Sequence, residues 1–308
     1  MELVFRGIEK FDFVKPKLKS PTSFWAKLTQ KTDYASYFDI FTSLLEIRSA
    51  NAIKFAVNFA REVSLFKNMQ PFREQPSDKV IRAFVNDVGY DFDGNDIIKL
   101  EKRDKMWHFN FKNGYFDSLH NDFKHPTWLK FDSEFDFEFD FGGVLTKDDE
   151  GTTLFHVMTI SPVPNDFGIN LKKLVLAFEF EYYEKAFYKH DEDGFPHHIK
   201  THELGKKMEV DEILSTKIRL SETPKRWHYQ DWAFSNGREN LNRFGGEPCW
   251  IQGAYYPVCP ETGEVMSFLF QFDNLPSSGP FSFGGGGGIF YFFWCDTSKI
   301  STYVYQQT

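Results

Sequence analysis

The feature that most constrains the fold is a strict two-residue alternation between residues 131 and 141. Phenylalanines and acids take alternate positions there: Phe135, Phe137, Phe139 and Phe141 against Asp132, Glu134, Asp136, Glu138 and Asp140. Successive side chains of an extended strand point to opposite faces. The pattern therefore predicts a β-strand with one buried aromatic face and one charged face, and we call its five acids the acidic stripe.

Aromatic content extends this prediction to most of the chain. Phenylalanine alone fills 37 of 308 positions, and aromatic residues make up 19% of the sequence. Because each buried ring removes roughly 150–250 Å² from water, ring packing should build the core. Further alternation is found at Trp107, Phe109 and Phe111, and in Leu174–Tyr183, where Phe178, Phe180 and Tyr182 oppose Glu179 and Glu181. A β-rich protein is expected.

The first hundred residues follow a helical period instead. Apolar residues recur at three- and four-residue steps from Ala35 to Phe66, with a break near Ser49, and a third short helix is expected over Ser77–Val88. We therefore predict an α+β protein with a mostly helical region at residues 1–104. A mainly antiparallel, aromatic-rich β domain should follow at residues 105–308.

Charge and hydropathy exclude several classes of partner. The net charge of −8 argues against nucleic acid, whose binding depends on lysine and arginine neutralising phosphates. No apolar run is long enough for a membrane span, and the N-terminus does not resemble a secretory signal. Three cysteines, Cys249, Cys259 and Cys295, do not make a disulfide framework. We expect a cytoplasmic protein.

The acidic stripe has two interpretations. Charge on an exposed sheet face or an edge strand keeps a protein soluble and prevents edge-to-edge pairing. The same carboxylates could instead hold a cation, act as an acid and base, or dock a basic partner. Solubility is the favoured explanation of the pattern, yet five acids on one face exceed what solubility requires, so we keep the stripe as a candidate binding face.

Other motifs give weaker chemistry. The segment Lys189–Lys207 is polar and contains His190, His197, His198 and His202, which we interpret as a long exposed loop with solvated histidines rather than a metal site. Residues 91–96 are interpreted as a turn and not a calcium loop, since the glycine stands at the wrong position. Gly284–Gly288 lacks the lysine of a phosphate loop and is interpreted as the entry to an apolar strand. We expect no catalytic residue, no metal and no cofactor.

The C-terminal third carries a family pattern. Gly245-Gly246 is followed by Pro248, Trp250 and Gln252, then by a turn with Cys259, a strand ending at Gln271-Phe272-Asp273, and a Gly-rich entry to the aromatic strand 289–294. This order resembles the YwqG-like family of unknown function, and it is similar to the C-terminal domain of programmed cell death protein 2. The single Cys259 departs from the paired-cysteine turn of those eukaryotic relatives.

The resemblance implies an α+β domain assembled from two similar halves, with no established catalytic residues. A faint earlier copy is suggested by Phe141-Gly142-Gly143. Within the pattern, Trp250 should be buried in the core. Gln252 and Gln271 either satisfy each other, which is favoured, or receive a peptide backbone. With the acidic stripe, these three residues complete the candidate binding set.

We therefore expect a non-enzymatic cytoplasmic module that binds a protein or peptide partner, a basic one by charge complementarity. Members of the YwqG-like family have been proposed as immunity proteins, so the resemblance implies neutralisation of a toxin. The alternative is a metal-assisted hydrolase that uses the His190–His202 loop and the acidic stripe. A chaperone for a ribosomal protein is a third class, implied by the eukaryotic relative. The sequence does not fix the oligomeric state.

Overall fold

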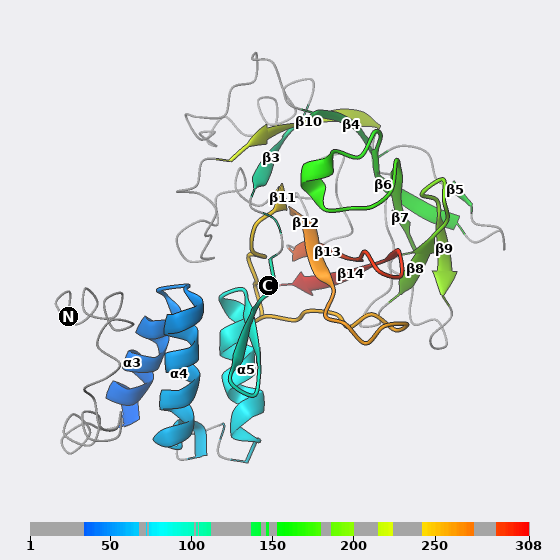
Figure 1. Ribbon diagram of the computed structural model, residues 1–308. Helices are drawn as coiled ribbons and strands as arrows, with labels where there is room; N and C mark the ends of the chain where they lie inside the picture. The colour runs from blue at the N-terminus through cyan, green and yellow to red at the C-terminus, as the bar shows by residue number, and fades with distance from the viewer. Residues whose placement is uncertain are drawn as a thin grey trace. The chain divides into compact units, whose positions relative to one another are not determined.

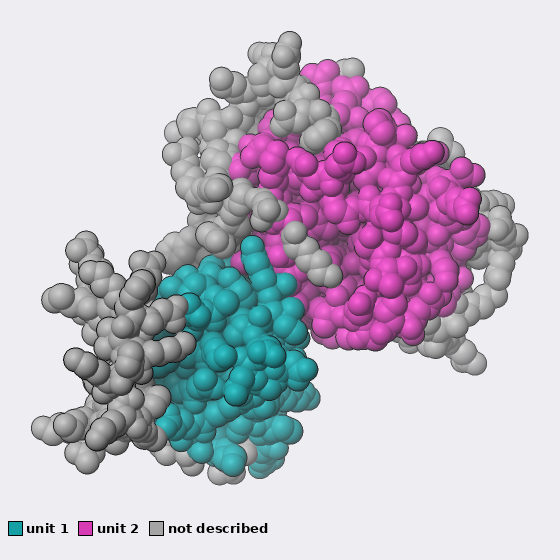
Figure 2. All heavy atoms as spheres, viewed as in Figure 1, with its two compact units in different colours: residues 1–99 teal, residues 100–308 magenta. Residues whose placement is uncertain are grey.

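The computed structural model describes residues 34–67, 72, 74–101, 103, 105–111, 137–142, 146–147, 153–179, 186–199, 215–223, 242–273 and 288–307. The chain divides into two compact units, residues 1–99 and residues 100–308, coloured separately in Figure 2. The division lies five residues before the boundary expected from the sequence. None of the described helices is long and apolar enough to cross a membrane.

The first unit contains the helices expected from the apolar period. They are α3 (Tyr34–Leu45), α4 (Ala50–Glu62), the short 3-10 helix η2 (Leu65–Lys67) and α5 (Ser77–Asp87). The break near Ser49 is confirmed: the Ser49 hydroxyl accepts a hydrogen bond from the Ala52 N–H at 3.3 Å and caps α4. Their apolar faces share a core with Tyr90 and Phe92.

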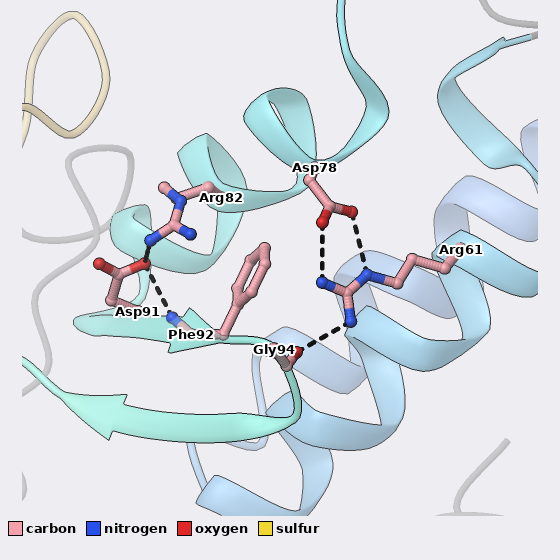
Figure 3. A network of polar contacts seen from close by, with 6 residues as sticks. All are labelled: Arg61, Asp78, Arg82, Asp91, Phe92 and Gly94. Carbon is pink, nitrogen blue, oxygen red and sulfur yellow. Dashed lines mark hydrogen bonds and ion pairs between the residues drawn. The ribbon is translucent and has the colours of Figure 1, made fainter.

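A hairpin of β1 (Tyr90–Asp93) and β2 (Asp96–Lys99) completes this unit. Residues 91–96 are thus a strand, a turn and a strand, and the turn interpretation is confirmed. Phe92 is 1% exposed and lies between two guanidinium groups, 5.0 Å from that of Arg61 and 4.6 Å from that of Arg82 (Figure 3).

Both arginines also tie the hairpin to the helices. Arg61 of α4 binds both carboxylate oxygens of Asp78 at 2.9 and 2.8 Å and the carbonyl of Gly94 at 3.0 Å (Figure 3). Arg82 of α5 pairs with Asp91 of β1. The hydrogen bond to Asp78 is the main reason that the pKa of Arg61 is raised, and the same bond lowers the pKa of Asp78.

The second unit is built on one large antiparallel sheet, described here as twelve strands. They are β3 (Met106–Phe111), β4 (Phe137–Phe141), β5 (Thr146–Lys147), β6 (Thr153–Ile160), β7 (Leu174–Phe178), β8 (Phe187–His190), β9 (Pro196–Ile199), β10 (Thr216–Glu222), β11 (Arg243–Gly245), β12 (Ser267–Asp273), β13 (Gly288–Cys295) and β14 (Ile300–Gln307). Their order is β5-β6-β4-β10-β3-β11-β12-β13-β14-β8-β9, and β7 pairs with β6 (Figure 1). The predicted α+β class with a mainly antiparallel β part is confirmed.

The sheet curves so that its two ends approach each other. The Val175 N–H of β7 donates to the carbonyl of Gly194, in the turn between β8 and β9, at 2.9 Å. Gly194 has φ +77°, and a Cβ there would lie 2.0 Å from the carbonyl oxygen of Lys173. This close approach therefore requires glycine.

Strand β13 shows why the chain needs so many rings. Phe290, Phe292 and Trp294 face the larger core of this unit, together with Trp107, Phe141 and Phe244, whereas Ile289, Tyr291 and Phe293 face a second core on the opposite side. All eight residues of β13 are buried. A strand covered on both faces has a continuous apolar sequence, and the prediction of an apolar strand after the glycines is confirmed.

Two strand expectations require correction. The acidic strand is not an edge: β4 pairs with β10 on one side and with β6 on the other, and its residues 131–136 lie outside the described part. The expected alternation after Leu174 is wrong at Glu179, which is 5% exposed. The Glu179 N–H donates to the Tyr188 hydroxyl of β8 at 2.8 Å and the Glu179 carbonyl accepts from the Tyr303 hydroxyl of β14 at 3.1 Å, so side chains of two strands that do not pair with β7 reach this position.

Candidate functional site

The chain leaves β11 through the glycine pair Gly245-Gly246. Gly245 and Gly246 have φ +72° and +75°, and a Cβ on Gly246 would lie 2.3 Å from the Met106 sulfur. A larger residue would be strained at either position and would collide with Met106 at the second. The following segment, residues 247–253, is irregular rather than a strand.

Side chains of the sheet hold this segment by its backbone. The Gln271 Oε1 of β12 accepts a hydrogen bond from the Cys249 N–H at 2.8 Å, and the Tyr291 hydroxyl of β13 donates to the Cys249 carbonyl at 2.6 Å. Of the two roles predicted for Gln271, the structure therefore has it receive a peptide backbone, that of its own chain. Gln252 has an exposed side chain, so pairing with Gln271 was the wrong preference.

A second glutamine, which sequence reasoning missed, completes the attachment. The Gln306 Oε1 of β14 accepts from the N–H groups of Ile251 and Gln252 at 2.9 and 3.0 Å, and its Nε2 donates to the Gly253 carbonyl at 2.8 Å. An amide offers both a donor and an acceptor, so one side chain can bind an extended backbone at three points. The available signal was a glutamine following alternating rings in an apolar strand.

Trp250 belongs to this segment and packs against the second core. Its ring centroid is 4.6 Å from that of Tyr291, 5.4 Å from that of Tyr256 and 6.1 Å from that of Phe293. The side chain packs against the second core but is only half-buried, less than the burial expected from the sequence. Its Nε1 is buried and has no hydrogen-bond partner among the described residues.

Residues 250–266, which we call the Trp250 loop, form an ordered excursion from the sheet. The Cys259 N–H donates to the Glu264 carbonyl at 2.8 Å, and the Met266 N–H donates to the Pro257 carbonyl at 2.9 Å. Tyr255 is 39% exposed and Val258 50%. With Ile98 of the first unit, these are the exposed large hydrophobic residues of the described chain.

Two exposed acids, Glu261 and Glu264, belong to the same loop as Tyr255 and Val258. Glu261 accepts from the Lys189 ammonium at 2.7 and 2.9 Å, and Glu264 accepts from the Thr297 hydroxyl at 3.1 Å. The loop thus presents both apolar and charged side chains at the surface, a mixture found in protein interfaces.

Next to the attached segment the sheet buries a row of polar side chains. His108 of β3, Arg243 of β11 and Gln271 of β12 are partners in register, and each is 0% exposed. Arg243 donates to the Gln271 Oε1 at 3.3 Å and also to the Glu247 carbonyl, and His108 Nδ1 lies 2.6 Å from the Thr223 hydroxyl. These hydrogen bonds offset part of the free-energy cost of burying the three polar side chains.

The described part of the acidic stripe is paired with bases. Asp140 lies 2.5 Å from the Lys217 ammonium and Glu138 lies 2.7 Å from the Arg219 guanidinium, both on the neighbouring strand β10. The hydrogen bond that the Lys217 ammonium donates to Asp140 is the main reason that the pKa of Lys217 is raised. Asp132, Glu134 and Asp136 lie outside the described residues. Where it is described, the stripe is one half of a mixed-charge sheet face.

The histidine-rich segment is not the long exposed loop expected. Residues 187–199 form the hairpin β8–β9, and His190 is buried, because β8 pairs with β14 at the start of this segment. His190 Nδ1 lies 3.0 Å from the Gly194 carbonyl and its Nε2 lies 2.7 Å from the Ser301 hydroxyl. Both ring nitrogens are thus engaged. His197 pairs with Asp191 at 3.2 Å, His198 packs on Tyr188, and His202 lies outside the described residues.

The three cysteines are free and buried. No group of three His, Cys, Asp or Glu side chains in the described ranges could hold a metal ion. Comparison of the chain with protein-family models, with curated proteins and with solved structures finds no match.

Proposed function

We propose that the chain is a non-enzymatic protein-binding module, and that the Trp250 loop is its docking surface for a partner with a basic surface. One observation carries the proposal. Two of the exposed large hydrophobic residues of the described chain, Tyr255 and Val258, lie within four positions of each other in this loop, near a half-buried tryptophan. Binding hot spots are enriched in tryptophan and tyrosine.

The attachment of the loop supports the proposal. Gln306 fixes the backbone at residues 251–253, and Trp250 stacks on Tyr291 and Phe293. A loop already held in one conformation loses little entropy when a partner binds. The Trp250 loop is therefore suited to direct contact without rearrangement.

Charge indicates the kind of partner. The net charge of −8, with the exposed Glu261 and Glu264 in the docking loop, favours a basic protein and would accelerate its association at low salt. The family resemblance favours one version of this function, in which the chain is a cytoplasmic immunity protein and the partner is a toxin. A chaperone acting on a basic ribosomal protein would use the same surface.

The hydrolase alternative has less support. Both nitrogens of His190 are engaged in hydrogen bonds, and the described acids of the stripe are paired with Lys217 and Arg219. A ligand set made from these residues would first have to break those contacts. No observation in the described chain favours this alternative over the binding module.

The test starts from a partner identified by cross-linking to the full chain and then purified. Association and dissociation rates are measured for the wild type, for Tyr255→Ser/Val258→Ser and for the matched control Ile98→Ser, at low and high salt. We expect the double variant to bind at least about tenfold more weakly, or about 1.4 kcal/mol, with the control unchanged. The wild-type association rate should fall with salt.

Two outcomes contradict the proposal. Equal affinity of the double variant and the wild type would place the interface elsewhere. Sedimentation that shows a self-associated wild type and a monomeric double variant would make the occupant a second copy of this chain and not a basic partner.

A further inference from the structure

Two of the three cysteines begin turns that pack against each other. Cys259 starts the turn 259–264 within the Trp250 loop, and Cys295 ends β13 and starts the turn that leads into β14. The Cys259 sulfur lies 3.0 Å from the Ser298 hydroxyl, and the Cys295 sulfur lies 3.7 Å from the Thr262 hydroxyl. Each thiol therefore contacts the turn to which the other belongs.

Further bonds hold the two turns in this position. The Gly263 N–H donates to the Cys259 carbonyl at 2.9 Å, which closes the first turn. Glu264 links the turns, because its Oε2 accepts from the Thr297 hydroxyl at 3.1 Å and lies 4.0 Å from the Cys295 sulfur. The two thiols are thus held in one small cluster by reciprocal contacts.

The surroundings of Cys259 favour its thiolate. Burial by itself would raise the pKa of the Cys259 thiol, but hydrogen bonds from the Ser298 and Thr262 hydroxyls, and from the backbone N–H groups of Thr262 and Glu261, outweigh burial and lower that pKa. The thiolate is the nucleophilic form of cysteine. The side chains of Glu261, Thr262 and Glu264 in the same turn are exposed.

We propose that Cys259 and Cys295 are a dithiol that hydrogen peroxide oxidises to a Cys259–Cys295 disulfide. The Cys259 thiolate attacks one peroxide oxygen, the O–O bond breaks, and Cys259 becomes a sulfenic acid as hydroxide leaves. The Cys295 sulfur then attacks the Cys259 sulfur, so that the S–S bond forms as the S–O bond breaks, and the leaving hydroxide takes the Cys295 proton to become water. The two thiols lose two electrons and two protons in total, and one peroxide is reduced to two waters.

The bond would join the Trp250 loop covalently to the turn between β13 and β14. In a reducing compartment such a disulfide is transient and is reversed by cellular thiols, so the pair would act as a sensor of oxidant. Cys259 lies within the docking loop and Cys295 lies outside it, at the end of β13, and the oxidation itself does not depend on a partner.

Differential alkylation of the native full chain tests the proposal without any substitution. The protein is treated with hydrogen peroxide at neutral pH, remaining thiols are alkylated after unfolding, and peptides are mapped by mass spectrometry without reduction. We expect a Cys259–Cys295 linked peptide, with Cys249 still alkylated, and loss of Cys259 thiol at least about fivefold faster than that of Cys249. Dithiothreitol should restore both thiols.

Variants sharpen the assignment. Cys249→Ser is the matched control and should form the linked peptide at the wild-type rate. Cys295→Ser should leave a sulfenic acid at Cys259 that dimedone traps. Absence of the linked peptide in the native wild type, or a linkage to Cys249 formed as readily, would overturn the proposal.

Discussion

His190 provides a test of how the β8–β14 contact contributes to stability. The side chain is 5% exposed, and its ring packs edge-on against Trp294 at 5.1 Å between centroids. A carbonyl only accepts, so the Nδ1 that faces Gly194 must carry the proton, and Nε2 then accepts from the Ser301 hydroxyl. The neutral ring satisfies both contacts, and we expect His190→Gln to remove the titration while keeping a polar side chain.

The magnitude follows from the pKa. Burial of the ring is the main cause that lowers the pKa of His190 from 6.5 to about 4. Because the folded pKa lies below the unfolded value, the unfolded chain binds more protons between these two values. The stability due to the neutral ring is complete above pH 6.5 and is lost as pH falls toward 4. The whole interval corresponds to about 3 kcal/mol, of which about 2 kcal/mol is lost between pH 7 and pH 5.

Urea unfolding at pH 7 and pH 5 measures this loss. The free energy of unfolding of the wild type should fall by about 2 kcal/mol more than that of His190→Gln. Other titrating groups, including the half-buried His156, occur in both proteins and cancel in the comparison.

The reasoning fails if wild type and His190→Gln lose the same free energy between the two pH values. It also fails if His190 titrates near 6.5 in nuclear magnetic resonance spectra, because a group that protonates without cost is not buried in this way. Either result would restore His190 as an accessible ring and reopen its use as a metal ligand.

Three further predictions concern other contacts. Gln306→Leu removes the side chain that binds residues 251–253, and should cost about 2 kcal/mol in urea unfolding; an unchanged midpoint would argue against the attachment. Phe92→Ala empties the space between Arg61 and Arg82 and should lower the free energy of unfolding by about 3–5 kcal/mol in the same measurement. A loss below about 1 kcal/mol would contradict the burial of Phe92. A double-mutant cycle of Glu138 and Arg219 should give a coupling below about 1 kcal/mol that weakens with salt; a larger, salt-independent value would contradict exposed pairing.

Local patterns predicted much of the fold. Helical periodicity located α4 and α5 to within a few residues, and Ser49 marked the boundary between two helices because its hydroxyl caps the second. The apolar run after the glycines predicted β13. In each case the signal is a helix cap, a helical apolar period or a continuous apolar run. Such a signal lies within the segment itself, so it can be read from the sequence.

Expectations failed where the partner strand is distant in sequence. Polar residues around His190 suggested a solvated loop, yet pairing with β14 more than a hundred residues later buries this histidine. Asp140 belongs to an acidic stripe when the strand is considered alone, whereas its neighbour in space is Lys217. Burial and charge at these positions depend on strand order, which alternation along one strand does not specify.

The same reasoning explains where the candidate site ended up. Gln271 was selected as a residue able to bind a peptide backbone, and it does bind one, that of Cys249 in its own chain. A buried amide or guanidinium without partners would destabilise the sheet, so the fold uses such groups for its own irregular segment. In the Trp250 loop the side chains of Tyr255 and Val258 remain exposed, whereas the backbone of residues 251–253 is held by Gln306. A binding surface in this chain is therefore better sought among the exposed side chains of a segment that polar contacts hold in place than among the polar residues that hold it.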